Sequence, residues 1–141
     1  MTRTMSWRFS LFVAILAAAC GGAKEPAAPG AAAAKPGVAA TGKVITITMI
    51  TDEKSSRFEP NQVEAHRGDV LRFTVGVGVH NVHFLPDSNP GIPDLPPASE
   101  LLQLPGQTLD ITVDFPAGKT IYFQCDPHAA LGMRGHLKVD G

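Results

Sequence analysis

Cysteine is scarce in this chain: of its 141 residues only Cys20 and Cys125 are cysteines, beside one tryptophan and one tyrosine. An excess of charge of one sign is also lacking, since 12 basic residues face 13 acidic ones. No basic run is interleaved with aromatic residues, which argues against nucleic-acid binding. The sequence also lacks internal repeats and a long amphipathic helical pattern, and its length allows one ordinary domain.

An apolar run at residues 9–19 follows two arginines at the N-terminus. This is the layout of a secretory signal, and the run is too short to span a bilayer comfortably as a permanent helix. Residues 16–22, Leu-Ala-Ala-Ala-Cys-Gly-Gly, resemble a bacterial lipobox, although Ala17 stands where leucine is favoured. We therefore expect residues 1–19 to be a signal peptide and Cys20 to carry a membrane-anchoring lipid. The alternative is an ordinary secretory signal in which Cys20 is incidental.

Residues 20–42 are almost entirely alanine, glycine and proline, without apolar periodicity. Proline prevents a continuous helix here, and a flexible chain of this length typically reaches about 25 Å. We expect a flexible tether that lifts the following domain off a membrane, or else a plain spacer. With Cys20 lipidated, Cys125 would be the single thiol of an exported domain and could form no internal disulfide. Metal ligation is then the best reason for its presence.

From residue 43 onward the pattern changes to short, β-branched segments separated by glycine and proline. This pattern predicts that residues 43–141 form an all-β sandwich or barrel. The predicted strands are residues 44–50, 62–65, 70–75, 80–85, 109–115, 120–124 and 135–139. In the strand at 109–115, alternation places four apolar side chains on one face: Leu109, Ile111, Val113 and Phe115.

Near the C-terminus a thiol, an imidazole and a thioether follow one another at Cys125, His128 and Met133. A second imidazole, His80, begins the predicted strand 80–85. One cysteine, two histidines and a weak methionine are the ligands of a blue copper ion, with the methionine in a long axial position. Each residue alone has an ordinary interpretation as packing or surface. The four together predict a copper site.

The other three histidines are expected not to bind the metal. His83 follows His80 by three residues, and strand alternation separates their side chains to opposite faces. His66 precedes a turn and is expected to be exposed, and His136 is expected to point outward from the last strand.

The segment from Pro86 to Gly106 interrupts the strand pattern with six prolines. Only residues 98–104 are compatible with a short helical turn. A loop of this length is either functional or an insertion. Because it follows the strand of His80 directly, we expect it to lie near the metal, or else to be a structural connection that covers one sheet edge.

Several motifs lie along the predicted domain: Phe58-x-Pro-x-x-Val63, Gly68-Asp-x-Leu-x-Phe73, His80-Asn81 and Cys125-x-Pro-His-x-x-x-Gly-Met-x-Gly135. Together they resemble a plastocyanin-type cupredoxin over residues 58–139. The resemblance implies a Greek-key β-sandwich, one-electron transfer by copper, and a role for Asn81 in steadying the ligand loop. In two departures, Val79 stands where the family often has proline, and the glycine-rich segment 75–79 predicts a more flexible approach to His80.

These patterns lead to one functional hypothesis. The protein is expected to be an exported, lipid-anchored, monomeric blue copper protein of the bacterial periplasm or cell surface, not an enzyme. It would pass single electrons between transiently bound redox partners. The alternative is copper carriage or storage with the same ligands. Copper catalysis is disfavoured because the sequence shows no second ligand cluster, and a Cys–His hydrolase because no third group orients the pair.

Overall fold

The computed structural model describes residues 40 and 42–141. The predicted signal peptide and nearly all of the predicted tether therefore lie outside the described residues. The described part folds into strands and two short 3-10 helices. None of its helices is long and apolar enough to cross a membrane.

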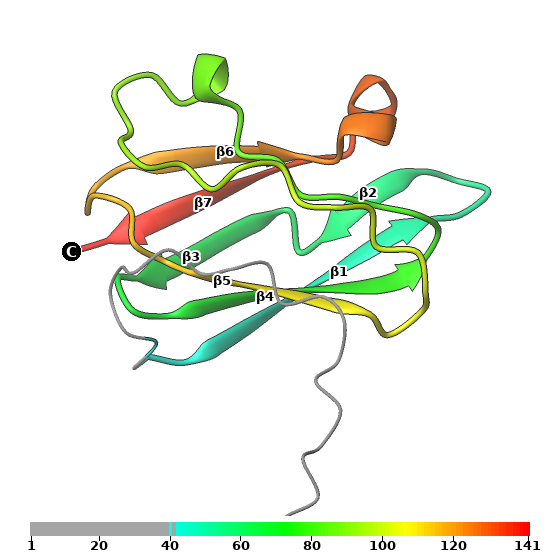
Figure 1. The fold of residues 1–141 in the computed structure, drawn as a ribbon, viewed down its shortest axis with the longest axis horizontal. Helices are drawn as coiled ribbons and strands as arrows, with labels where there is room; N and C mark the ends of the chain where they lie inside the picture. Colours follow the sequence, from blue (N-terminus) through cyan, green and yellow to red (C-terminus); the bar gives the residue numbers. More distant parts are fainter. Residues whose placement is uncertain (1–39, 41) are drawn as a thin grey trace, which may run out of the picture.

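The strands form two sheets that face each other as the layers of a sandwich (Figure 1), which confirms the predicted all-β architecture. The first sheet has the order β2 (Ser56–Glu59), β1 (Val44–Thr51), β4 (Val70–Val77) and β5 (Thr108–Thr112). The second has the order β3 (Gln62–His66), β7 (Arg134–Asp140) and β6 (Thr120–Gln124). The pairs β1–β4 and β3–β7 are parallel, and the other pairs are antiparallel.

Aromatic packing fills the space between the sheets. The rings of Phe58, Phe73 and Phe123 meet edge to face, with centroid separations of 5.0 to 5.9 Å. Edge-to-face contacts of this kind add to the free energy gained by burying the rings. Gly135, which pairs with Phe123 across β6 and β7, leaves room for that ring, because a Cβ here would lie 2.3 Å from it. The core therefore fixes β6, the strand that leads into Cys125.

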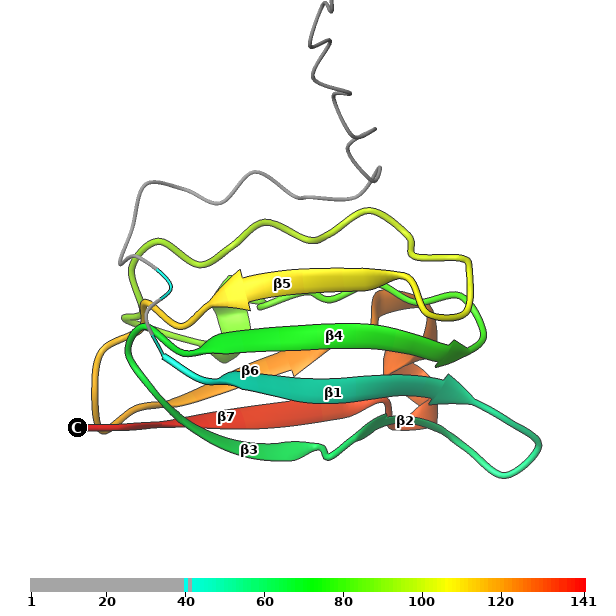
Figure 2. The same cartoon turned by 90° about the horizontal axis from the view of Figure 1, so that it is seen from below.

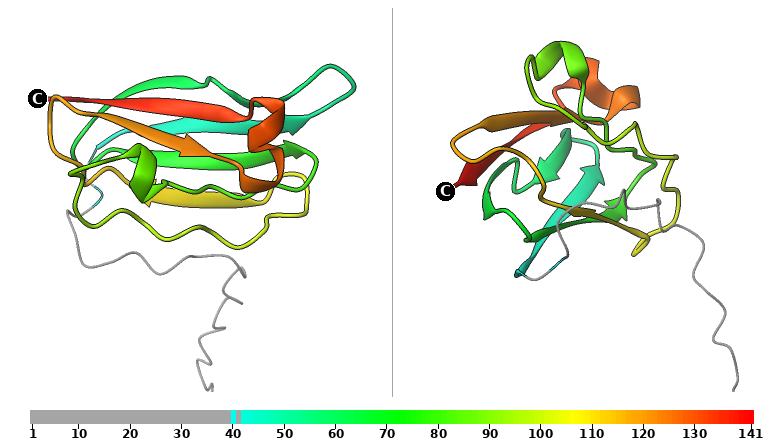
Figure 3. Two further views of the ribbon diagram at one scale, coloured as in Figure 1. Left: turned by 90° about the horizontal axis from the view of Figure 1, so that it is seen from above. Right: turned by 60° about the vertical axis from the view of Figure 1, so that its left-hand side comes forward.

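The two ends of the sandwich differ. Figures 1 and 2 show the 3-10 helix η2 (Asp126–Leu131) and the β1–β2 hairpin at one end, and the C-terminus at the other. We call the first the loop end. The second is the entry end, where the chain enters β1 through Lys43 and where Asp69 lies. The other 3-10 helix, η1 (Pro86–Ser88), is on the same side of the molecule as β6 (Figure 3).

Most of the predicted strands are confirmed, with ends within two residues of the predicted ones. The strand predicted at 109–115 ends earlier, at Thr112. Leu109, Val113 and Phe115 are buried as expected, whereas Ile111 is half-buried. Strand β2 and both 3-10 helices were not predicted.

The strand predicted at 80–85 is wrong. Two isolated bridges replace it, His80 with Leu102 and His83 with Gln124. Further along, a side chain takes the place of a backbone partner: Asn89 accepts a hydrogen bond from the Tyr122 N–H at 2.7 Å and donates one to its carbonyl at 2.9 Å. The segment thus covers the edge of β6 without forming a continuous ladder.

Residues 98–104, which are compatible with a short helical turn, form none. Their backbone groups pair instead with the segment of His80. Leu102 and His80 exchange two backbone hydrogen bonds, at 2.7 and 3.0 Å, and the Ser99 N–H donates to the Val82 carbonyl at 2.9 Å. The long loop is thus a structural connection, and its closeness to a metal stays a prediction. It covers a flank of the sandwich beside β5 (Figures 2 and 3), and it touches His80.

Candidate metal centre

His80 follows the end of β4 by three residues, and its side chain is fully buried. Its Nε2 lies 2.8 Å from the Val77 carbonyl oxygen. Because a carbonyl only accepts hydrogen bonds, Nε2 must carry the hydrogen, which leaves the lone pair on Nδ1. A hydrogen bond on the outer nitrogen is the usual way in which a protein orients a metal-binding histidine.

Gly78 lies against the imidazole of His80. It has a φ of 104°, and a Cβ there would lie 2.9 Å from Nε2 of His80 and 3.1 Å from Cβ of Thr51. Glycine is therefore required by close packing and by a backbone conformation that side chains rarely adopt. From the sequence, Gly78 was notable only as part of the glycine-rich segment 75–79 that precedes His80. The expected flexibility of this segment stays a prediction.

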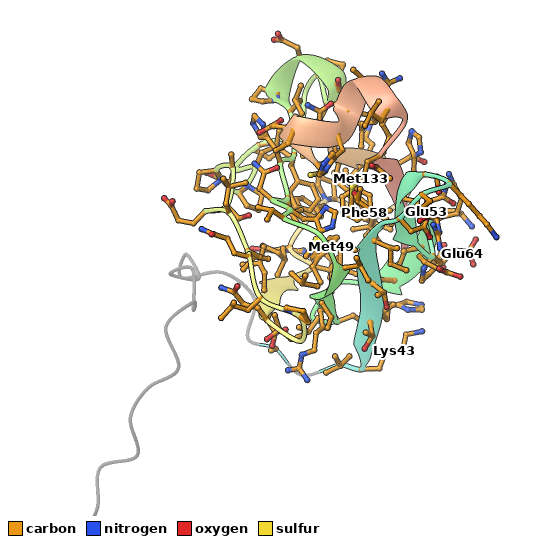
Figure 4. The ribbon with its side chains drawn as sticks, turned by 90° about the vertical axis from the view of Figure 1, so that its right-hand side faces the viewer. Lys43, Met49, Glu53, Phe58, Glu64 and Met133 are labelled. Carbon is orange, nitrogen blue, oxygen red and sulfur yellow. The ribbon has the colours of Figure 1, made fainter. Side chains whose placement is uncertain are left out.

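The remaining predicted ligands lie on one compact loop. Cys125 follows β6, His128 lies in η2, and Met133 precedes β7. Backbone hydrogen bonds close the loop, from Cys125 N–H to the Met133 carbonyl at 3.2 Å and from Met133 N–H to the His128 carbonyl at 3.2 Å. Cys125 and Met133 are fully buried and His128 is half-buried. Figure 4 looks onto this end of the molecule and shows Met133 beneath η2.

Three of the four predicted ligands offer atoms that converge. Cys125 Sγ lies 3.7 Å from Nδ1 of His80 and 3.4 Å from Nδ1 of His128, and the three atoms lie within 4.8 Å of one another. The thiol hydrogen of Cys125 can be donated to the Nδ1 lone pair of His80. A metal ion that replaces this hydrogen could be shared by the sulfur and both Nδ1 atoms. The donor set of one sulfur and two imidazole nitrogens fits copper.

Burial shifts the pKa of both His80 and Cys125 toward the neutral form. It lowers the pKa of His80, aided by the nearby His128 and opposed by the hydrogen bond to the Val77 carbonyl, which favours the neutral imidazole that a metal requires. Burial raises the pKa of the Cys125 thiol, against the opposing effect of the Asn81 and His128 backbone amides. The thiol therefore keeps its proton until a metal displaces it.

Asn81 joins the segment of His80 to the loop of Cys125. Its Oδ1 accepts from the Asp126 N–H at 2.8 Å, and its Nδ2 donates to the Asp126 carboxylate at 2.9 Å. These bonds are the contact expected of a residue that steadies the ligand loop. Sequence reasoning missed Asp126, whose position directly after Cys125 was the available signal.

The remaining histidines lie elsewhere. Nδ1 of His83 is 3.1 Å from both carboxylate oxygens of Asp126, on the outer side of the loop. His66 is exposed, as predicted. His136 is half-buried, with its ring 5.6 Å from that of Tyr122. Within residues 40 and 42–141, the only group of three or more His, Cys, Asp or Glu residues placed to share a metal ion is His80, Cys125 and His128.

Known proteins show the same fold and sequence pattern. The family model of copper-binding proteins of the plastocyanin/azurin family matches residues 45–140. A plastocyanin of Prochlorothrix hollandica is 30% identical over 97% of this chain and 96% of its own length. A chloroplastic plastocyanin of Oryza sativa subsp. indica is 37% identical over 59% of this chain, but only 54% of that protein is covered.

A solved structure agrees with these sequence matches. The oxidised form of plastocyanin from Dryopteris crassirhizoma matches 68% of this chain and all of its own, with a TM-score of 0.56 and 28% identity. Residues 45–140, which match the family model, include both segments that carry the converging atoms, and the donor set suits copper. The chain therefore belongs to the plastocyanin/azurin family of copper-binding proteins.

Proposed function

We propose that the protein is a blue copper protein that carries single electrons between redox partners, with His80, Cys125, His128 and Met133 as the copper ligands. The observation that carries the proposal is the convergence of Cys125 Sγ with the Nδ1 atoms of two histidines from separate segments. The copper family to which the chain belongs supports the choice of metal. Copper would supply the one-electron redox change.

Electron transfer is favoured over the alternatives by how the ligands are fixed. His80 is held by Val77 and Leu102, and the loop of Cys125 is closed by backbone hydrogen bonds. Ligands that move little suit an ion that must change charge quickly. Readily exchanging copper carriage would be served by looser ligands. We accordingly propose no catalytic role.

His128 is the proposed exit for the electron, because it is half-buried whereas the other three proposed ligands are fully buried. Exposed apolar side chains flank both histidines in sequence: Val77 and Val79 precede His80, and Leu131 follows His128, with exposures of 55%, 41% and 67%. An apolar surface of modest size suits brief docking, since transient redox interfaces are small. We infer that redox partners dock at the loop end.

We also propose that the protein is exported and anchored by lipid on Cys20 at a bacterial periplasmic or cell-surface membrane. In this organisation residues 1–19 are the signal, 20–42 the tether and 43–141 a monomeric copper domain. The test is fractionation of cells that express the full chain or Cys20→Ala. Membrane association that is lost in the variant is expected, and equal distribution of the two proteins would contradict the anchor.

The copper site is tested by the visible spectrum of the purified full-length protein after Cu(II) is added. An intense thiolate-to-copper band, bleached by a reductant, is expected in the parent and in Cys20→Ser. It should be lost in Cys125→Ser. A pale spectrum in the parent would contradict the site. Rapid loss of copper to a chelator, without a reversible redox couple, would favour copper carriage instead.

A further inference from the structure

Asp126 lies at the centre of a polar network beside the proposed copper ligands. Its carboxylate accepts hydrogen bonds from three side chains: Asn81 at 2.9 Å, Gln124 at 2.8 Å and His83 at 3.1 Å. Its backbone N–H donates to Asn81 as well. The Asp126 side chain is 40% exposed, but it is held by the protein as well as solvated by water.

The donors are themselves oriented. The Tyr122 hydroxyl donates to Oε1 of Gln124 at 2.8 Å, which leaves the Gln124 amide hydrogens for Asp126. His83 is positioned by two backbone hydrogen bonds with Gln124, at 2.9 and 3.0 Å. Strand alternation gave His83 no role as a metal ligand. In the structure its imidazole bonds to the carboxylate of Asp126, the residue that follows Cys125.

The network touches both ligand segments one residue away from a ligand. Asn81 follows His80, and Asp126 follows Cys125. A carboxylate that accepts from several donors is held in its ionised form. A fixed negative charge close to copper stabilises Cu(II) relative to Cu(I), since the oxidised ion carries more positive charge.

We propose that Asp126 is a positioning residue that sets the reduction potential of the copper site through its fixed charge, and that His83 holds its carboxylate in place. This proposal rests on the proposed function, because it assumes that the four ligands bind copper. It gives His83 a role near the copper site although His83 is not itself a metal ligand.

The first experiment is voltammetry of the full-length copper-loaded protein with Asp126→Asn. Loss of the charge should raise the reduction potential and change the equilibrium ratio of Cu(I) to Cu(II) about threefold to tenfold. For a one-electron couple this is about 30 to 60 mV. Asp87→Asn is the matched control, because it removes an exposed charge from η1, and it should shift the ratio less than about twofold. Asp126→Glu keeps the charge and should stay within the range of this control.

His83→Val tests the second part. It should shift the potential and the thiolate-to-copper band in the parent, but neither in the Asp126→Asn background, because His83 acts through that carboxylate. His83→Gln, which keeps a donor, should restore the parent values. Equal shifts in both backgrounds would overturn the role of His83, and an Asp126→Asn potential equal to the parent's would overturn the role of Asp126. A parent that shows no blue band would instead refute the proposed function.

Discussion

The two ends of the sandwich are both tied together by buried polar side chains, but they are completed in different ways. At the entry end, Asp69 accepts the Lys43 N–H on one oxygen and the His66 N–H on the other, both at 2.9 Å. At the loop end, the Nδ1 atoms of two histidines meet the sulfur of Cys125.

The difference lies in how acceptors and donors balance. Each oxygen of Asp69 has a backbone donor, so protein atoms alone complete the entry end. At the loop end, one thiol and two imidazole nitrogens converge, and a cation could be shared by all three in place of the thiol hydrogen. We therefore expect metal to stabilise the loop end and to leave the entry end unaffected.

The largest effect is expected from copper itself. A ligand that binds only the folded state at 1,000 times its Kd stabilises that state by about 4 kcal/mol. The free energy of unfolding, measured by denaturant titration with and without copper, should rise by this order in the parent. In Cys125→Ser copper should raise the free energy of unfolding only slightly. In Asp69→Asn, at the entry end, copper should raise it as much as in the parent. An equal rise in Cys125→Ser would place the metal elsewhere.

Asp69→Asn should break the entry end alone. The amide group that replaces one oxygen cannot accept a backbone N–H, so a buried donor loses its partner at a cost of about 1–3 kcal/mol in the free energy of unfolding. Denaturant titration measures this loss. The thiolate-to-copper band should be unchanged, and a shifted band would show that the two ends are coupled.

The same carboxylate predicts a pH dependence. The His66 backbone N–H, opposed by burial and aided by Lys43, lowers the pKa of Asp69 below its ordinary value of 3.8. A carboxyl group with a lowered pKa stabilises the fold above its unfolded pKa, and this contribution is lost as pH falls through the folded pKa. The stability difference between the parent and Asp69→Asn should therefore shrink below about pH 4. A constant difference would contradict an ionic role for Asp69.

A matched pair of glycine substitutions sharpens the contrast. In Gly42→Ala the new Cβ would lie 2.0 Å from Oδ1 of Asp69, and in Gly78→Ala it would lie 2.9 Å from Nε2 of His80. Both should cost about 1–2 kcal/mol in the free energy of unfolding, from crowding and, at Gly78, from a positive φ. Only Gly78→Ala should also shift the copper band, because it alone displaces a ligand. A band shift in Gly42→Ala would remove the distinction.

The sequence predicted the residues that carry chemistry better than the contacts that hold them. Alternation gave most strands, because side-chain direction along a strand is a local property. It failed at 80–85, where His80 bridges to Leu102 and His83 to Gln124, contacts between residues distant in the chain. It also left Asp126 and the Val77 carbonyl unassigned. Spacing identifies residue types that suit a metal, but the hydrogen bonds that orient them appear only once the chain is folded.

The smallest effect on stability is expected at the proposed docking surface. Leu131 is 67% exposed at the loop end, so Leu131→Glu should change the free energy of unfolding by less than about 0.5 kcal/mol. It should nevertheless slow electron self-exchange between oxidised and reduced copies about threefold to tenfold, because two loop ends with added negative charge repel each other. Line broadening in NMR spectra measures this rate without a known partner. Val44→Glu, at a 50% exposed position of the entry end, is the control. If both substitutions slow exchange equally, net charge and not the loop end controls the encounter, and the functional contrast between the two ends would fail.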